Sequence, residues 1–268
     1  MKSLPLTPER WFEGLAQACA QLRLGWPKDW PGLAAVARVC VCSLGLDAKA
    51  TPEIAAMTGF TLAVAHDLEA LALQAALEDE PRYHNRLHTA DVMLTITTML
   101  HVLEPTADEA ARPWAAAILA AAAAHDFGHP GGVNKQRFDI ESLSWRSVAE
   151  HAARLPDAWR ARIETLILYT DPQTVPDNHA KVAGQPFAWT QPWCQVLLNE
   201  ADILLSASAR FGPDLSQALA QEWQRVGFAA HATVATPAGR AQFLRSIRFS
   251  SPAALALAMP EQVQQQLQ

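Results

Sequence analysis

Hydrophobic and polar residues follow one another along this chain at helical rather than strand spacing. Alanine and leucine dominate the apolar stretches, while isoleucine and valine are scattered instead of occupying every second position. No run with a period of two is long enough to predict a strand. The pattern predicts an all-α fold, a compact multi-helix bundle with helices near residues 8–23, 32–44, 52–79, 87–103, 107–124, 141–154, 157–169, 191–210, 214–229, 237–248 and 252–258.

Prolines mark several of the predicted helix starts. A hydroxyl residue that can cap a helix directly precedes a first-turn proline at Thr7-Pro8, Thr51-Pro52, Thr236-Pro237 and Ser251-Pro252. The segment from Thr170 to Trp189 carries further prolines and a glycine, and we predict it to be the longest irregular stretch. A loop of that length in a compact domain is often functional.

The composition is that of a globular protein with a sizeable core. The chain has 268 residues, of which 50% are hydrophobic. We expect residues 1–50, rich in tryptophan and leucine, to form a helical extension packed on a main domain that spans residues 51–268. The formal net charge of -6 and the lack of a basic run exclude a nucleic-acid polymer as partner. A small anionic substrate fits if metal ions reverse the local charge.

The cysteines and apolar stretches bear on the compartment. Cys19, Cys40, Cys42 and Cys194 match no common zinc pattern, and we predict free thiols, with Cys40 and Cys42 buried on an apolar helix. The N-terminus lacks a signal-peptide pattern, and the apolar stretch from Pro113 to Ala124 is too short to span a bilayer. We therefore expect a cytoplasmic protein without a membrane partner.

Two short segments carry histidines and aspartates at metal-ligand spacing. In Tyr83-His84-Asn85-Arg86-Leu87-His88-Thr89-Ala90-Asp91, the residues His84 and His88, and likewise His88 and Asp91, share one helix face. The second segment, His125-Asp126-Phe127-Gly128-His129-Pro130-Gly131, begins where an alanine-rich helix ends. Adjacent side chains of a helix point about 100° apart, so this His-Asp pair can hold one ion or bridge two.

A further carboxylate comes from Asp202, which lies in an otherwise apolar helix and so requires a cation or hydrogen-bond partners. Together with His88, His125 and Asp126 it predicts a metal site, with His84 as a spare imidazole for proton transfer. A His-Asp dipeptide alone means little, because His66-Asp67 is another one without a partner motif. We assign the remaining histidines to the surface or to helix packing: His101, His151, His179 and His231.

These motifs resemble the HD-domain superfamily of metal-dependent phosphohydrolases, and more closely the class I cyclic-nucleotide phosphodiesterases. The resemblance runs from about Leu68 to Pro252. It implies a catalytic domain at residues 51–268 with the metal site in a central pocket. Its motifs are Tyr83-His84-Asn85-x-x-His88-x-x-Asp91-Val92, His125-Asp126-x-x-His129-Pro130-Gly131-x-x-Asn134, Tyr169-Thr170-Asp171 and Asn199-Glu200-Ala201-Asp202.

The resemblance also implies a role for each matched residue. A zinc ion would be held by His88, His125, Asp126 and Asp202, and Asp126 would bridge to a second ion, magnesium or manganese, held mostly by waters. A hydroxide between the ions would attack a 3',5'-cyclic nucleotide or a related phosphodiester, and His84 would protonate the leaving oxygen. The outer or water-positioning groups would be His129, Asn134, Tyr83, Asn85 and Asp91.

The chain departs from the family pattern where the family binds its substrate. A Glu-Asn-His-His stretch is replaced by Glu141-Ser142-Leu143-Ser144, and Leu205 stands where an asparagine is common. Phe243 is a candidate stacking residue or a core aromatic. Arg240 stands where a purine-binding glutamine is expected, so Gln242 would serve only from a shifted helix. Arg240 is instead suited to bidentate recognition of an anion.

Three alternatives stay open beside a metal-dependent phosphodiesterase. Another HD-type phosphohydrolase, such as a nucleotidase or phosphomonoesterase, would use the same metals with little need for a leaving-group acid. A di-iron oxygenase would need further nitrogen ligands, of which His129 is one candidate. A non-catalytic module would keep a metal for folding. Neither the nucleobase nor the oligomeric state follows from the sequence.

Overall fold

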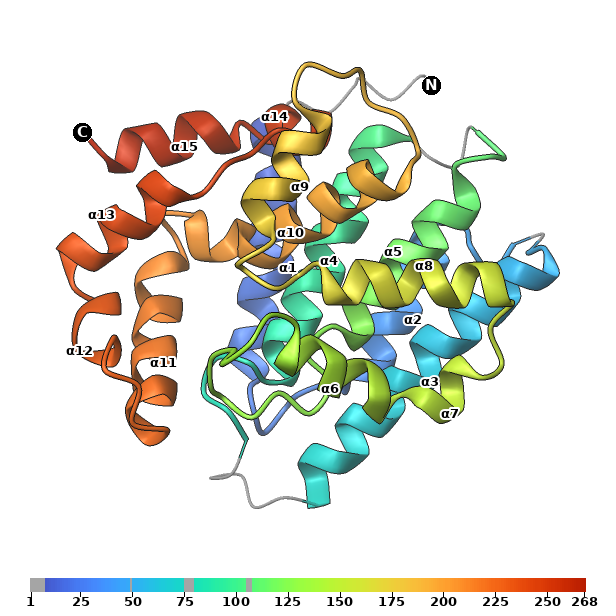
Figure 1. The fold of residues 1–268 in the computed structure, drawn as a ribbon, viewed down its shortest axis with the longest axis horizontal. Helices are drawn as coiled ribbons and strands as arrows, with labels where there is room; N and C mark the ends of the chain where they lie inside the picture. The colour runs from blue at the N-terminus through green and yellow to red at the C-terminus, as the bar shows by residue number, and fades with distance from the viewer. Residues whose placement is uncertain (1–7, 49, 75–79, 105–107) are drawn as a thin grey trace.

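The computed structural model describes residues 8–48, 50–74, 80–104 and 108–268, and every regular element within them is a helix. The predicted all-α fold is confirmed (Figure 1). The helices are α1 (Pro8–Gly25), α2 (Leu33–Ser43), α3 (Pro52–Gln74), α4 (Arg86–Leu103), α5 (Arg112–Ala124), α6 (Asp139–Ser147), α7 (Ala149–Ala152), α8 (Asp157–Leu168), α9 (Val175–Val182), α10 (Gln191–Ala207), α11 (Gly212–Arg225), α12 (His231–Val234), α13 (Pro237–Ser246), α14 (Pro252–Ala256) and α15 (Met259–Gln266).

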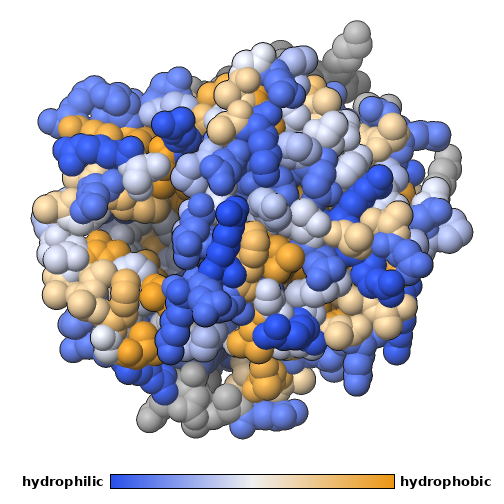
Figure 2. All heavy atoms as spheres, viewed as in Figure 1, coloured by the Kyte–Doolittle hydropathy of each residue, from blue (hydrophilic) through white to orange (hydrophobic). Residues whose placement is uncertain are grey.

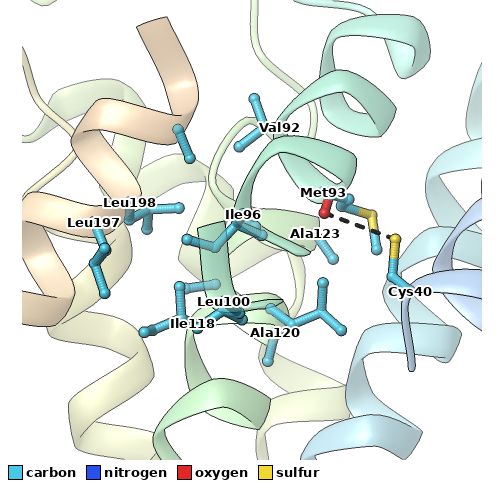
Figure 3. Packing of buried hydrophobic residues seen from close by; sticks show 14 of the residues in the cluster. Cys40, Val92, Met93, Ile96, Leu100, Ile118, Ala120, Ala123, Leu197 and Leu198 are labelled. Carbon is cyan, nitrogen blue, oxygen red and sulfur yellow. Dashed lines mark hydrogen bonds between the residues drawn. The ribbon is translucent and has the colours of Figure 1, made fainter. Parts of the chain in front are cut away.

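Helix α5 lies in the centre of the molecule. Every residue from Ala115 to Ala124 is buried, and the helix packs against α3, α4, α8 and α10. A helix that is apolar on all sides belongs in a core, and alanine allows neighbouring helices to approach closely. Figure 3 shows this packing, in which α5 meets side chains of α4 and α10 that include Ile96, Leu100, Leu197 and Leu198.

The N-terminal helices pack on the same core. Helix α1 lies against α4, and α2 lies against α3 and α4. The buried Cys40 of α2 donates its thiol hydrogen to the carbonyl oxygen of Met93, 3.7 Å away (Figure 3). Cys40 is therefore buried as predicted, but the prediction for Cys42 is wrong, because two positions further along the helix its side chain is exposed. All four cysteines are free.

The serine and threonine residues that precede a first-turn proline cap their helices as predicted, wherever the structure describes them. The hydroxyl oxygens of Thr51, Thr236 and Ser251 accept hydrogen bonds from the backbone three residues later, at 3.4, 3.1 and 3.1 Å. Each bond satisfies one of the unpaired N–H groups of a helix N-terminus. Thr7 lies outside the described residues.

Several predicted boundaries need correction. The segment predicted to be irregular from Thr170 to Trp189 contains helix α9, because Pro176 occupies the first turn of that helix instead of breaking it. Helix α15 begins in the same way with Pro260. The helix predicted from residue 107 starts at residue 112, after a turn in which Asp108 accepts a hydrogen bond from the N–H of Ala110. Residues 141–154 form α6 and α7, separated at Val148.

Among the described residues, one helix is long and apolar enough to cross a membrane by length and composition. It is α3, which is longer than the apolar stretch noted in the sequence, and 44% of its most apolar window is buried within the protein. The core helix of a globular protein meets the same criterion. On the face of the molecule seen in Figure 2, hydrophilic and hydrophobic residues are interspersed in small areas.

Candidate metal centre

The four predicted metal ligands meet at the junction of three helices. His88 lies in the first turn of α4, His125 and Asp126 follow the end of α5, and Asp202 lies within α10. The Nε2 atom of His88 is 3.0 Å from Asp202 Oδ1 and 3.3 Å from Asp126 Oδ2. The Nε2 atom of His125 is 3.2 Å from Asp126 Oδ2 and 3.5 Å from Asp202 Oδ1. Each imidazole thus faces both carboxylates.

Local structure fixes where these side chains point. The side-chain oxygen of Asn85 accepts hydrogen bonds from the N–H groups of Leu87 and His88, so it caps α4 and sets the start of the helix. The Nδ1 atom of His125 lies 2.9 Å from the carbonyl oxygen of Ala122 and donates its hydrogen there. That bond orients the ring so that Nε2 faces the two aspartates.

The geometry of the cluster fits a cation. Although Nε2 of His88 and Nε2 of His125 lie close to carboxylates, both atoms are buried and neither has a hydrogen-bond partner of suitable geometry. Buried polar atoms almost always have a partner, so two unpaired nitrogens beside two carboxylates indicate a missing ligand. A nitrogen and oxygen donor set of this kind suits zinc and similar divalent ions. Donor atoms of His88, His125 and Asp202 lie within 4.8 Å of one another.

The charges in the cluster lead to the same conclusion. Burial lowers the pKa of His88, but the close carboxylates of Asp126 and Asp202 outweigh burial and raise it to about 9. Burial raises the pKa of Asp202, and the two histidines outweigh that effect and hold it below its usual range. Without a metal, protons therefore provide the positive charge that the carboxylates require. A divalent cation would displace those protons, so its affinity should fall as the pH falls.

A second cluster surrounds His84. One oxygen of Glu222 lies 2.5 Å from His84 Nδ1, and the other accepts hydrogen bonds from the N–H groups of Tyr83 and His84, at 2.7 and 3.0 Å. The Glu222 side chain is only 2% exposed. Burial raises its pKa, but the contacts with His84 outweigh burial and lower it, so Glu222 stays ionised. This carboxylate fixes the imidazole of His84 and leaves its Nε2 atom available.

His129 supports His84 from one side. The two rings are stacked, with centroids 3.7 Å apart and planes 23° apart. The backbone N–H of Gly131 donates to His129 Nδ1 over 3.0 Å. Burial, and then the neighbouring His84, lower the pKa of His129 to about 4. The ring therefore stays neutral, with its hydrogen on Nε2.

The hydrogen bonds of His129 and Glu222 disfavour a second metal site with histidine ligands. His84, His129 and Glu222 have donor atoms within 4.8 Å of one another, a spacing that could hold a metal. The lone pair of His129 is already engaged by Gly131, however, and Glu222 is engaged by His84 and the backbone. A di-iron oxygenase would require His129 to give up that bond, so the geometry speaks against this alternative.

Tyr83 joins the two clusters. Its ring centroid lies 4.7 Å from that of His84 and 4.8 Å from that of His88. Its hydroxyl is hydrogen-bonded to Ser206 Oγ over 2.8 Å. Burial and the nearby Asp202 raise its pKa well above the ordinary value, so the ring is a neutral wall between the clusters.

Part of this site lies in a segment that resembles a known protein family. Residues 83–147 match the family model described as 3'5'-cyclic nucleotide phosphodiesterase. Over this segment the chain is similar to the class I cyclic-nucleotide phosphodiesterases. The match includes His84, His88, His125 and Asp126 and ends before Asp202, covering about a quarter of the chain. No curated protein matches the chain.

Asp91 lies one turn beyond His88, but its carboxylate is bound elsewhere. Arg23 of α1 donates to its two oxygens at 2.8 and 2.5 Å. The same guanidinium lies over the ring of Phe211, 4.8 Å from its centroid. Asp91 thus attaches the phosphodiesterase-like segment to the N-terminal helix.

Asn134 holds a buried acid beside the metal cluster. Its side-chain nitrogen donates to both oxygens of Glu141, at 3.1 and 2.9 Å, and its oxygen accepts from the N–H of Ile140. Burial, together with the charges of Asp171 and Asp126, raises the pKa of Glu141 to about 7. In the sequence, Glu141 is only the first residue of a segment that differs from the family pattern. The structure shows that it is also close enough to Asp126 for the two charges to interact.

Of the four residues predicted to bind substrate, one lines a pocket. Phe243 lines a pocket of about 70 Å³ next to Tyr83. Leu205 is buried in the hydrophobic core, and Gln242 is exposed. Arg240 donates to the carbonyl oxygens of Ser206 and Ser208 and to the side chain of Gln266, so recognition of an anion would have to compete with these bonds.

Glu222 is a residue of the His84 cluster that the sequence motifs do not include. It lies on α11 seven residues after Leu215 and three after Leu219, both of which line the pocket. Residues at these spacings share one helix face, so an acid on the apolar face of an amphipathic helix was the available signal. In the sequence alone, however, a glutamate resembles an ordinary surface residue, because charged side chains are mostly exposed.

The other histidines lie outside both clusters. His151 pairs with Asp67 over 2.7 Å, which gives the second His-Asp dipeptide a structural partner. His101 stacks on Trp11, and His231 contacts the carbonyl oxygen of Phe228. His179 is buried, with Nδ1 2.8 Å from Ser250 Oγ.

Proposed function

We propose that this protein is a metal-dependent phosphodiesterase that hydrolyses a 3',5'-cyclic nucleotide or a related phosphodiester. One observation carries the proposal: His84, bound through Nδ1 to an ionised Glu222, adjoins a cluster of carboxylates and unpaired imidazole nitrogens. A proton donor beside a divalent-cation site is what cleavage of an ester with a poor leaving group requires. The match of residues 83–147 to the family supports the same reaction.

The cluster residues would hold the cofactors. We assign a zinc ion to His88, His125, Asp126 and Asp202, and a magnesium or manganese ion to Asp126 and surrounding waters. When bound, the ions would supply positive charge that neutralises the phosphodiester and lowers the pKa of bound water. The unpaired Nε2 atoms of His88 and His125 support the tighter of the two assignments.

The protein's own residues handle the leaving group. The oxygen of water bonds to phosphorus as that water releases a proton to solvent, and the ester bond breaks. The leaving oxygen takes a proton from Nε2 of His84, which then regains a proton from solvent. Glu222 keeps the ring oriented for this transfer, and the neutral His129 stacks against it. Asn134 and Glu141 provide hydrogen-bonding groups that would orient water near Asp126.

We also infer the setting of this activity. The partner would be a small phosphoester, since the net charge of -6 disfavours nucleic-acid polymers. Four free cysteines are in keeping with a reducing compartment, and we propose the cytoplasm.

The test is turnover by purified protein loaded with zinc and magnesium, or zinc and manganese. Substrates are cyclic AMP, cyclic GMP, bis(p-nitrophenyl) phosphate and the monoester p-nitrophenyl phosphate. We expect hydrolysis of the diesters, with little turnover of the monoester. A clear preference for the monoester would favour a phosphomonoesterase and contradict the proposal. Absence of turnover on every substrate would favour a non-catalytic module.

A further inference from the structure

Arg23, in the last turn of α1, contacts two other parts of the molecule. Its terminal nitrogens donate to the two carboxylate oxygens of Asp91 in α4, at 2.8 and 2.5 Å. One of these nitrogens also donates to the carbonyl oxygen of Cys19, one turn earlier in α1. The guanidinium lies over the ring of Phe211, 4.8 Å from its centroid. Helix α1, which lies against α4 (Figure 1), is therefore joined to a further region through this one side chain.

The contact with Asp91 fixes the first part of α4. Asp91 follows His88 by three positions, so the two side chains share one face of the helix. The Asp91 side chain is only 4% exposed, and a buried carboxylate requires a positive or hydrogen-bonding partner. Two parallel N–H donors hold a carboxylate in one orientation, unlike a single point charge. Arg23 therefore limits how far α4 can rotate or slide next to His88.

The contact with Phe211 fixes the turn between α10 and α11. Phe211 is 6% exposed and directly precedes α11. Helix α10 carries Asp202, and α11 carries Glu222, so this turn links a predicted metal ligand to the partner of the proton donor. A second guanidinium, that of Arg210, also lies over the Phe211 ring, 5.5 Å from its centroid, and pairs with Glu13 of α1 over 3.3 Å. Helix α1 thus holds this turn through two guanidinium groups.

We infer that Arg23 is a positioning residue for the proposed reaction, because it sets the orientation of α4 relative to α11 and so places His84 beside the metal centre. This inference rests on the proposed function. His84 directly precedes the start of α4, while its imidazole is held by Glu222 of α11, so a shift between these helices would move the proton donor. A displacement of about 1 Å in an active site can lower the rate by roughly 100-fold. Arg23 acts through Asp91 and Phe211.

The two contacts together require a guanidinium. This planar group can donate two parallel hydrogen bonds to a carboxylate while its face stacks on an aromatic ring, whereas an ammonium group is a compact charge. Arg23→Lys therefore keeps a positive charge beside Asp91, so the buried carboxylate is not left unpaired, but it loses the second parallel bond and the stacking. Phe211→Leu breaks the stacking from the other side and keeps the ion pair.

The test compares the wild type, Arg23→Lys and Phe211→Leu, each loaded with zinc and magnesium, on cyclic AMP, cyclic GMP and bis(p-nitrophenyl) phosphate. We expect each variant to lower kcat for the cyclic nucleotides by roughly 10- to 100-fold, with unchanged KM and metal content. The aryl diester should lose less than about 10-fold, because its nitrophenolate departs without the proton of His84. Arg10→Lys, at an exposed position on α1, is the matched control and should change none of these values.

The double variant Arg23→Lys/Phe211→Leu tests whether the two residues act through one contact. Its kcat should be little lower than that of the more impaired single variant, whereas losses that multiply would overturn the inference. A lower melting temperature with wild-type kcat would show that Arg23 only stabilises the fold. Equal losses on both kinds of substrate would show that it acts on the metal ligands and not on His84. Either result would overturn the inference, while a wild type inactive on every phosphodiester would overturn the proposed function itself.

Discussion

The metal centre and the pocket lined by Tyr83 and Phe243, here called the side pocket, both adjoin the ring of Tyr83. Their polar atoms differ in whether they have hydrogen-bond partners within the protein. In the metal centre, Nε2 of His88 and Nε2 of His125 are buried beside two carboxylates without a hydrogen bond of suitable geometry. In the side pocket, the hydroxyls of Tyr83, Ser206 and Ser216 are all hydrogen-bonded within the protein. The metal centre therefore offers donor atoms that suit a cation, whereas the side pocket offers an apolar surface.

The difference explains why the two regions carry unequal information in the sequence. A cation demands particular donor atoms, so its ligands leave a residue-type signature that spacing can reveal. An apolar pocket can be lined by many different side chains of suitable size, so no residue type in the sequence indicates its position. The departures at Leu205 and Arg240 are consistent with this view, because neither residue lines the side pocket.

The largest expected effect is at Asp126. We predict that Asp126→Ala abolishes metal binding and turnover together, since this carboxylate faces both histidines of the cluster. Metal content by elemental analysis and turnover of bis(p-nitrophenyl) phosphate test this prediction. The matched control is Asp67→Ala in the other His-Asp dipeptide, which should retain both properties. An Asp126→Ala protein with full metal content and full activity would show that the cluster is not the catalytic metal site.

A smaller effect is expected at Glu222. Glu222→Gln removes the charge that orients His84 while preserving the size of the side chain. We predict that kcat falls roughly 10- to 100-fold, the scale for partners that orient a functional imidazole. Metal content should not change, because Glu222 contacts none of the four predicted ligands. Glu261→Gln, on the exposed face of α15, is the control, and an unchanged kcat in Glu222→Gln would remove Glu222 from the active site.

The smallest effect on activity is expected at His179, which belongs to neither region. Burial, and then the charge of Arg248, lower its pKa below the ordinary value of 6.5. The folded protein therefore keeps this imidazole neutral, while the unfolded chain takes up a proton near pH 6.5. Its contribution to stability is full above that pH and is lost as the pH falls through and below it.

We predict that His179→Gln retains wild-type turnover and loses less stability than the wild type between pH 7.5 and pH 5.5. Urea denaturation of both metal-free proteins at the two pH values measures the difference. Parallel pH dependence in the two proteins would contradict the assignment. A loss of turnover would mean that a buried histidine outside both clusters serves the reaction.

Much of the fold could be predicted from the sequence because helix starts here have local causes. Each helix that follows Thr51, Thr236 or Ser251 begins with a proline, and the hydroxyl oxygen of that residue accepts a hydrogen bond from the first turn. The same local reasoning failed at α9, where Pro176 was taken as a breaker although it fits a first turn. The break between α6 and α7 at Val148 has no glycine or proline to announce it.

The candidate site, like the fold, could be predicted only in part from the sequence. His88, His125 and Asp126 could be found because their spacing along the chain reflects their spacing in the helices. Glu222 could not be found, since it contacts His84 across 138 positions of sequence. The tie from Arg23 to Asp91 spans 68 positions and likewise left no local signal. Such contacts depend on how helices pack, and spacing along one helix says nothing about them.

The most direct test of the account is the leaving-group dependence of His84→Ala. Its turnover of a cyclic nucleotide, with a poor alkoxide leaving group, is compared with that of bis(p-nitrophenyl) phosphate, whose nitrophenolate departs without a proton. We predict unchanged metal content, a kcat that is lower by about 100-fold or more for the cyclic nucleotide, and a loss of less than about 10-fold for the aryl diester. Equal losses on both substrates, or full activity on the cyclic nucleotide, would contradict the role of His84 as the proton donor.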